Sequence, residues 1–204
     1  MVEWLINNVF EWAGLVTGVL CVWLMIRENY LTFPIGLLYA VITVVVVFRA
    51  QLYADVLLNL YYVVMNAYGW YFWRYARTAR HRQAAADNPE LVVGQVSLPS
   101  MGVLCFVILA GTVLMGIYFD RYTNAALPYP DSFTTVASFV AMWMSARKYL
   151  ESWLLWLVVN VVQVVLYLVK GIEAYAILYF IYVIMAIHGW RTWRQALPVV
   201  EQTA

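Results

Sequence analysis

The sequence YVVMNAYGWYFWR at Tyr62–Arg74 returns 120 residues later as YVIMAIHGWRTWR at Tyr182–Arg194. Seven of the 13 aligned positions are identical, including the ending Gly-Trp-x-x-Trp-Arg. The same offset pairs Arg27 with Arg147. An apolar chain seldom matches itself this closely by chance. The chain therefore contains an internal repeat, and this repeat decides the fold that the sequence predicts.

The amino-acid composition indicates the environment in which the repeat folds. Of the 204 residues, 65% are hydrophobic and 11% are charged, and the mean hydropathy is +0.76. A soluble domain has about 25% charged residues, and disordered chains are polar. The net charge of +1 lacks the basic excess that a nucleic-acid partner requires. These values exclude a soluble globule and predict an integral membrane protein that lies in a lipid bilayer and binds no nucleic acid.

Seven apolar runs are separated by charged residues, proline or glycine. A membrane-spanning helix needs about 20 mostly apolar residues, so we expect the fifth run to extend upstream. The predicted spans are Phe10–Ile26, Leu31–Phe48, Val56–Trp73, Leu98–Phe119, Phe133–Ala146, Trp153–Val169 and Ala174–Trp190.

The repeat covers the first three and the last three spans and leaves Leu98–Phe119 between them. Three helices reverse the direction of the chain, and one further helix restores it. The predicted fold is an all-α polytopic membrane protein with seven transmembrane helices in a 3+1+3 arrangement of two parallel three-helix repeats. Parallel repeats are typical of transporters; a duplicated scaffold without transport is the alternative.

This fold divides the chain into six parts. They are a periplasmic N-terminal segment (1–9), the first repeat (10–74), a cytoplasmic linker (75–97), a linker transmembrane helix (98–119), the second repeat (133–194) and a cytoplasmic tail (195–204).

The basic residues predict the orientation in the membrane. With seven spans, nine of the 12 lysines and arginines fall on the side of the linker. Cytoplasmic loops carry the excess of basic residues, so we expect the N-terminus in the periplasm and the C-terminus in the cytoplasm. Chance asymmetry is the alternative explanation.

Polar and aromatic residues at membrane depth are the candidates for substrate binding. One helical face of the sixth span repeats such residues at spacings of three and four. Amides bond hydroxyl groups, and aromatic faces attract flat or cationic rings. Amides that join one helix to another are the alternative. The candidates are Trp153, Trp156, Asn160, Gln163 and Tyr167, with Asn59 and Asn66 of the third span, Tyr39 and Thr43 of the second, and Tyr179 of the seventh.

The spans lack charged residues near the membrane midplane. Ion-coupled transporters usually carry carboxylates there, so the pattern favours facilitated diffusion. We find no spacing typical of a catalytic or metal site and expect no enzyme, cofactor or metal. Trp70, Trp73, Trp190 and Trp193 lie at the ends of spans and are expected to anchor in the membrane interface.

The stretches Asn29–Arg74 and Ser152–Arg194 resemble the PnuC family of bacterial vitamin transporters. The duplicated Gly-Trp-x-x-Trp ending and the stripe from Trp156 to Asn160 are the most specific parts of the resemblance. It implies a full-length relative of the SWEET fold in the bacterial inner membrane. It also implies facilitated diffusion of nicotinamide riboside, which phosphorylation in the cytoplasm then traps.

The resemblance leaves several alternatives open. Relatives within the family carry other vitamins such as thiamine or riboflavin. A membrane receptor or assembly subunit without transport is a second class of function, and a membrane enzyme is a third. Gly111 and Gly116 in the fourth span are compatible with packing within one chain and with a homo-oligomer alike.

Overall fold

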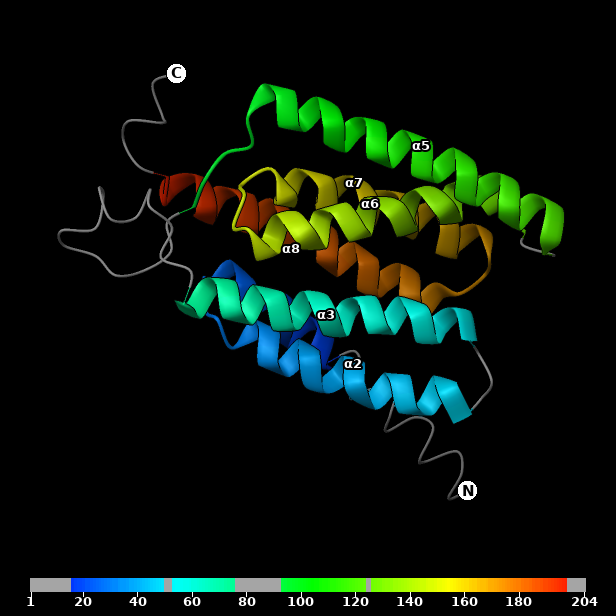
Figure 1. The fold of residues 1–204 in the computed structure, drawn as a ribbon, viewed down its shortest axis with the longest axis horizontal. Helices are drawn as coiled ribbons and strands as arrows, with labels where there is room; N and C mark the ends of the chain where they lie inside the picture. Colours follow the sequence, from blue (N-terminus) through cyan, green and yellow to red (C-terminus); the bar gives the residue numbers. More distant parts are fainter. Residues whose placement is uncertain (1–15, 50–52, 76–92, 124–125, 198–204) are drawn as a thin grey trace. The chain divides into compact units, whose positions relative to one another are not determined.

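The computed structural model describes residues 16–49, 53–75, 93–123 and 126–197. The predicted segment 1–9, residues 76–92 of the linker and the last seven residues lie outside this part. The described residues form seven helices (Figure 1). They are Val16–Ile26, α2 (Thr32–Arg49), α3 (Tyr53–Tyr75), α5 (Leu98–Tyr122), α6 (Pro128–Ala146), α7 (Ser152–Val169) and α8 (Glu173–Gln195).

Each predicted span overlaps one of these helices, which confirms the all-helical class. The fifth span extends upstream, as expected, because α6 begins at Pro128. Proline suits the first turn of a helix, where its missing N–H is not needed. Asp131 in the same turn adds a favourable charge at the positive end of the helix dipole.

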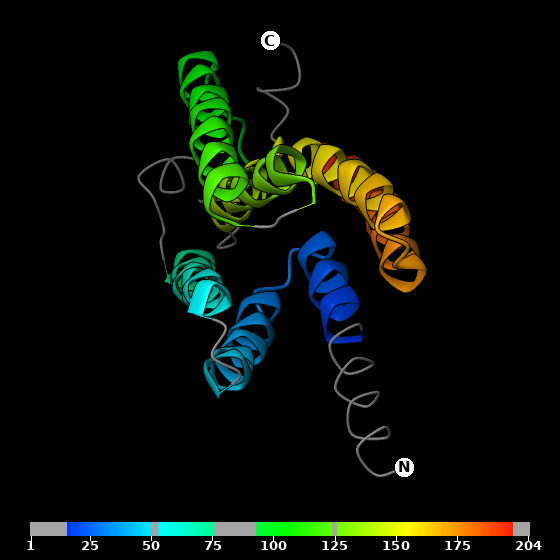
Figure 2. The same cartoon turned by 90° about the vertical axis from the view of Figure 1, so that its right-hand side faces the viewer.

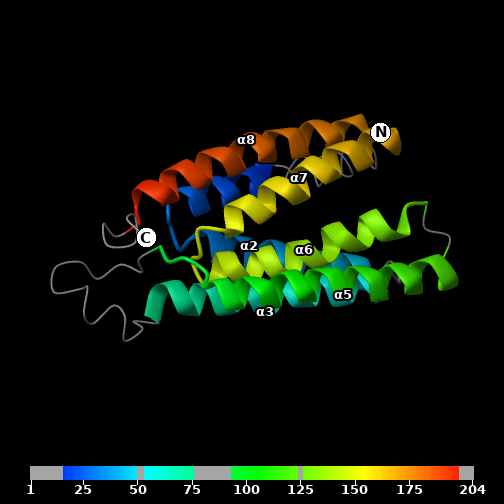
Figure 3. The same ribbon diagram turned by 90° about the horizontal axis from the view of Figure 1, so that it is seen from above.

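The chain forms two compact units, Met1–Leu91 and Val92–Ala204. In the first unit α2 packs on α3, and in the second unit sequential helices are neighbours from α5 to α8 (Figures 2 and 3). Small residues allow α5 to approach α6 closely. A Cβ atom at Gly111 would lie 2.9 Å from Val136, and one at Gly116 would collide with Tyr129. The single helix between the repeats thus packs with the second repeat.

Two described helices, α5 and α7, are each long and apolar enough to cross a membrane, and Val16–Ile26 and Thr32–Val45 are shorter apolar segments. Most of α5 is exposed in the monomer. Its exposed side chains include Val103, Phe106, Leu109 and Leu114. An apolar surface of this kind fits contact with lipid tails.

The turns at the ends of Val16–Ile26 and α6 have the same geometry. Glu28 has a φ of 55° and Lys148 a φ of 59°, a left-handed conformation that glycine usually provides at the end of a helix. Asn29 N donates to Leu24 O at 2.9 Å in one turn, and Tyr149 N donates to Met144 O at 3.0 Å in the other. The matching residues of the two turns are 120 positions apart.

A second contact is also found twice. In α2 and α3, Phe33 covers Gly69 and meets Trp73 edge-on at 5.0 Å between ring centroids. In α7 and α8, Trp153 covers Gly189 and meets Trp193 edge-on at 5.3 Å. The two sets again match at the offset of 120.

The interpretation of Trp193 as an interfacial anchor is wrong. Its side chain is 0% exposed, because it packs against Trp153. An anchoring tryptophan must reach the membrane interface. The duplicated indole therefore serves helix packing at this position.

The segment before α5 is fixed to the turn between α6 and α7. Gly94 N donates to Lys148 O at 3.1 Å, and Leu150 N donates to Gly94 O at 2.9 Å. Val96 N donates to Glu151 Oε2 at 3.1 Å. We call residues Val93–Val96 the strap, since these bonds hold the start of α5 to the α6–α7 turn.

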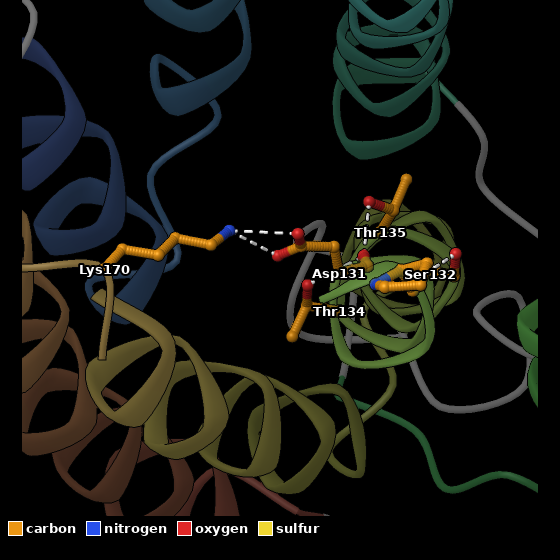
Figure 4. Close-up of polar contacts among 6 residues, drawn as sticks. Asp131, Ser132, Thr134, Thr135 and Lys170 are labelled. Carbon is orange, nitrogen blue, oxygen red and sulfur yellow. Dashed lines mark hydrogen bonds and ion pairs between the residues drawn. The ribbon is translucent and has the colours of Figure 1, made fainter. Parts of the chain in front are cut away.

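An ion pair joins α6 and α7 at their other ends (Figure 4). Lys170 Nζ donates to Asp131 Oδ1 at 2.7 Å and to Oδ2 at 3.0 Å. The main-chain carbonyl of Asp131 accepts bonds from Thr134 Oγ1 and Thr135 Oγ1. The side-chain carboxylate of Asp131 thus bonds Lys170, while its main-chain carbonyl accepts the hydrogen bonds of the two threonines in the first turns of α6.

Candidate functional site

The candidate site is centred on one face of α7. Trp156, Asn160 and Gln163 lie on this face because their spacings of four and three match the helical period. Asn160 is buried, while Trp156 and Gln163 are half-buried. Ser152–Val169 contains no charged residue. The face therefore offers neutral hydrogen-bonding groups beside an aromatic ring.

Asn160 has the most distinctive environment of the three. Its side chain is 5% exposed. Among the described residues, the fully buried side-chain polar atoms without a hydrogen-bond partner are Thr112 Oγ1, Ser152 Oγ and Trp153 Nε1, and the Asn160 amide is not one of them. An amide both donates and accepts hydrogen bonds, so this nearly buried side chain can bond a hydroxyl group of a ligand.

The Trp156 indole is held from α6. Its Nε1 donates to Ser145 Oγ at 3.0 Å, and Ser145 is fully buried. The sequence reasoning missed Ser145. The available signal is a difference between the repeats, since the matching residue of the first repeat is Met25.

Trp153 lies deeper than its neighbours on α7. It is 2% exposed and covers Gly189, where a Cβ atom would lie 2.6 Å from the ring. Its Nε1 is buried and has no hydrogen-bond partner among the described residues. These contacts give Trp153 a part in holding α7 on α8.

Three tyrosines form a stack between α7 and α8. The ring of Tyr167 lies 5.2 Å from Tyr175 at an interplanar angle of 23°, and 5.3 Å from Tyr179 at 19°. Tyr167 of α7 thus makes a stacking contact with each of the two rings from α8.

The four candidates of the first unit have different surroundings. Asn66 is 7% exposed, and its Nδ2 donates to Tyr62 O at 2.8 Å. Thr43 Oγ1 donates to Tyr39 O at 2.9 Å, and the Tyr39 side chain is exposed. Asn59 is half-buried on α3. The structure thus divides the ten predicted residues into a set of four in the first unit and a set of six in the second.

The two repeats carry their larger side chain on different helices of the matching helix pair. At Gly36 a Cβ atom would lie 2.5 Å from Asn66 Oδ1, so the Asn66 amide fills the space above this glycine. The matching residues of the second repeat are Trp156 and Ala186. The indole stands where the first repeat has glycine, and alanine stands where the first repeat has the amide.

In the described residues, no group of three or more His, Cys, Asp or Glu side chains is arranged to hold a metal ion. The groups available on the α7 face are amides and aromatic rings, which bind by hydrogen bonding and stacking.

Comparison with known proteins places the chain in a family. Residues 8–195 match the family described as "Nicotinamide mononucleotide transporter". The chain belongs to the nicotinamide mononucleotide transporter family. The match covers both repeats and the helix between them, and it confirms the resemblance to PnuC proteins.

Named relatives support this family assignment. The chain is 31% identical over 207 aligned residues to the nicotinamide riboside transporter PnuC of Escherichia coli K12, covering 90% of this chain and 84% of the relative. It is 27% identical to the riboflavin/roseoflavin transporter RibM of Streptomyces davaonensis, covering 94% of this chain and 89% of the relative. Proteins similar to this chain thus have names that refer to different vitamins.

A solved structure supports the fold of this family member. The chain resembles the crystal structure of the vitamin B3 transporter PnuC with a TM-score of 0.68 and 22% sequence identity. The similarity covers 100% of this chain and 88% of the other. At this identity the similarity supports the helical fold.

Proposed function

We propose that this chain is a transporter of the bacterial inner membrane that carries nicotinamide riboside by facilitated diffusion. Phosphorylation in the cytoplasm would trap the substrate and maintain its gradient. The relative that is 31% identical has the name of a nicotinamide riboside transporter. The structural observation that carries the proposal is the buried Asn160 amide beside Trp156 on an uncharged face of α7.

The chemistry of this face suits a flat, hydroxylated cation. The pyridinium ring of the riboside is cationic and aromatic, so it can stack on the Trp156 indole. The ribose hydroxyls both donate and accept, as do the amides of Asn160 and Gln163. Trp153, Tyr167 and Tyr179 remain in the proposal as residues that shape the site, together with the first-unit set of Tyr39, Thr43, Asn59 and Asn66.

The proposal includes the 3+1+3 arrangement with two parallel repeats, as in a full-length SWEET-like transporter. Its support is the duplication of contacts. The left-handed residues Glu28 and Lys148 occupy matching positions in two similar turns. The rings of Phe33 and Trp153 cover matching glycines. If the two halves were similar in sequence but folded differently, they would not need to make the same packing contacts at matching positions.

The deciding experiment is calorimetry on the purified chain with nicotinamide riboside, thiamine and riboflavin as separate ligands. We expect binding heat with the riboside. Replacement of Asn160 or Gln163 by Ala removes a neutral hydrogen-bond partner, so each should weaken binding about 2- to 10-fold. Val161→Ala is the matched control, since Val161 is an exposed residue of the same helix.

Several outcomes would contradict the proposal. Heat with another vitamin and none with the riboside would overturn the substrate. Unchanged affinity in both amide variants would indicate that Asn160 and Gln163 serve helix packing and do not bind the substrate. Binding without uptake into proteoliposomes would favour a receptor or an assembly subunit. Uptake that responds to a proton or sodium gradient would contradict facilitated diffusion.

Riboflavin transport is the second candidate function. It is favoured by RibM, since that match covers 94% of this chain. A larger tricyclic ring would also stack on an indole. Binding heat with riboflavin alone would establish this alternative.

A further inference from the structure

Ser145 is a buried hydroxyl residue at the end of α6 that contacts the candidate site. Its side chain is 0% exposed, and its Oγ accepts the Nε1–H of Trp156 at 3.0 Å. The indole has this one donor and no acceptor. The bond therefore uses the whole hydrogen-bonding capacity of the ring and leaves its faces for stacking.

The hydroxyl sits on a firmly held part of the chain. Lys148 N donates to the main-chain carbonyl of Ser145 at 2.9 Å within the left-handed turn. The strap is hydrogen-bonded to the same turn, because Gly94 N donates to Lys148 O at 3.1 Å. An indole bonded to Ser145 thus takes its orientation from a fixed turn as well as from α7.

The first repeat shows that the turn itself does not require serine. Met25 occupies the matching position, and its carbonyl accepts a bond from Glu28 N at 3.0 Å. Gly36 stands where the second repeat has Trp156. The hydroxyl is found in the repeat that has the indole, and it is missing in the repeat that has glycine.

We propose that Ser145 is a positioning residue that orients the Trp156 ring for stacking on the aromatic ring of the transported vitamin. The inference rests on the proposed function and deepens it. Ser145 acts through Trp156 and has no contact with the substrate. Without the bond, the indole can rotate away from the stacking orientation. Binding must then restore the orientation of the ring, which makes the binding free energy less favourable.

The test is a double-mutant cycle with nicotinamide riboside as the probe. Ser145→Ala should raise the Kd and the KM for uptake about 2- to 10-fold, as expected for one neutral hydrogen bond, and leave the maximal rate within about 2-fold. Trp156→Phe keeps a ring and removes the N–H donor. In that background, Ser145→Ala should add no further loss of affinity.

Ser138→Ala is the matched control. Ser138 is also on α6, and its Oγ donates to Thr134 O of its own helix at 2.6 Å. This variant should bind the riboside like the unmodified chain. Thermal unfolding of every variant separates loss of the fold from loss of the bond, and Ser145→Cys provides a close match in size with a weaker acceptor if the alanine variant unfolds.

The outcomes distinguish the inference from the function on which it rests. If the unmodified chain binds none of the vitamins, the proposed function fails. If it binds the riboside and Ser145→Ala, or the cysteine variant in its place, leaves affinity unchanged, the positioning role fails. An equal loss from Ser145→Ala with and without the Trp156 N–H would also overturn it, because the serine would then act independently of the indole.

Discussion

Single glycines set the distance between paired helices at the residue scale. Gly189 lies under the Trp153 ring, and Gly69 lies under Phe33. A side chain at either position would occupy space that the ring already fills. The sequence marks both residues within its repeated stretch, but the purpose of each becomes visible in the packing of the rings.

Gly189→Ala should destabilise the chain by about 1–3 kcal/mol, the usual cost of overpacking a filled core. The reason is that the added Cβ atom would lie 2.6 Å from the Trp153 ring. Thermal unfolding in detergent measures the effect. Gly102→Ala is the control, since nothing lies within 4 Å of a Cβ atom there. Equal stability of the two variants would contradict this account of the contact.

Connections between helices govern stability at the element scale. The Lys170–Asp131 ion pair joins the start of α6 to the end of α7 (Figure 4). The strap joins the start of α5 to the opposite end of the same helix pair. Both ends of the α6–α7 pair thus have a polar connection besides the apolar packing.

Replacing Asp131 by Asn should lower the free energy of unfolding by less than about 1 kcal/mol, because an exposed ion pair gains little over its solvated partners. The two side chains are 30% and 32% exposed. Reversing the charges with Asp131→Lys and Lys170→Asp should restore only part of the loss. The new lysine would lie at the positive end of the α6 dipole, where a cation is unfavourable. Unfolding measured at low and high salt checks this, and full recovery in the reversed variant would contradict it.

Replacing Glu151 by Ala should loosen the strap locally. The Val96 amide loses its charged acceptor, and charge-assisted hydrogen bonds are the stronger ones. We expect hydrogen exchange at Val96 to become about tenfold faster, which corresponds to about 1.4 kcal/mol. Glu151→Gln keeps an acceptor oxygen and serves as the control. Exchange at Val96 that is equally slow in all three proteins would show that the main-chain bonds alone hold the strap.

The placement of charge leads to a prediction about topology at the scale of the whole molecule. Nine of the 12 basic residues fall on one side of the seven predicted spans. A fluorescent protein that matures only in the cytoplasm should therefore be bright when fused to the C-terminus. A periplasmic phosphatase fused at that position should be inactive. The reverse pattern would overturn the orientation with the N-terminus outside.

The sequence predicts the helices well because apolar runs and charged breaks are local signals. The seven spans correspond to seven described helices, and the upstream extension of α6 is confirmed. The sequence does not reveal that the inter-repeat helix α5 packs on α6. That pairing depends on Gly111 and Gly116 meeting Val136 and Tyr129, which are contacts between residues well separated along the chain.

Prediction of the candidate site is less complete for the same reason. Helical spacing brings Trp156, Asn160 and Gln163 to one face without any tertiary information. It cannot separate them from Trp153, which shares the stripe but is buried on Gly189. Ser145 also escapes the pattern, because its importance comes from a bond across two helices.

The opposite placement of bulk in the two repeats has a consequence for protein engineering. A designer who wished to build this chain from two identical halves could not choose residues one position at a time. Tryptophan at position 36 would collide with Asn66, since even a Cβ atom there would lie 2.5 Å from Oδ1. Positions 36 and 66 would have to be converted together to the tryptophan and alanine found at 156 and 186. The smallest unit that can be exchanged between the halves at this contact is therefore the pair of residues, one on α2 and one on α3.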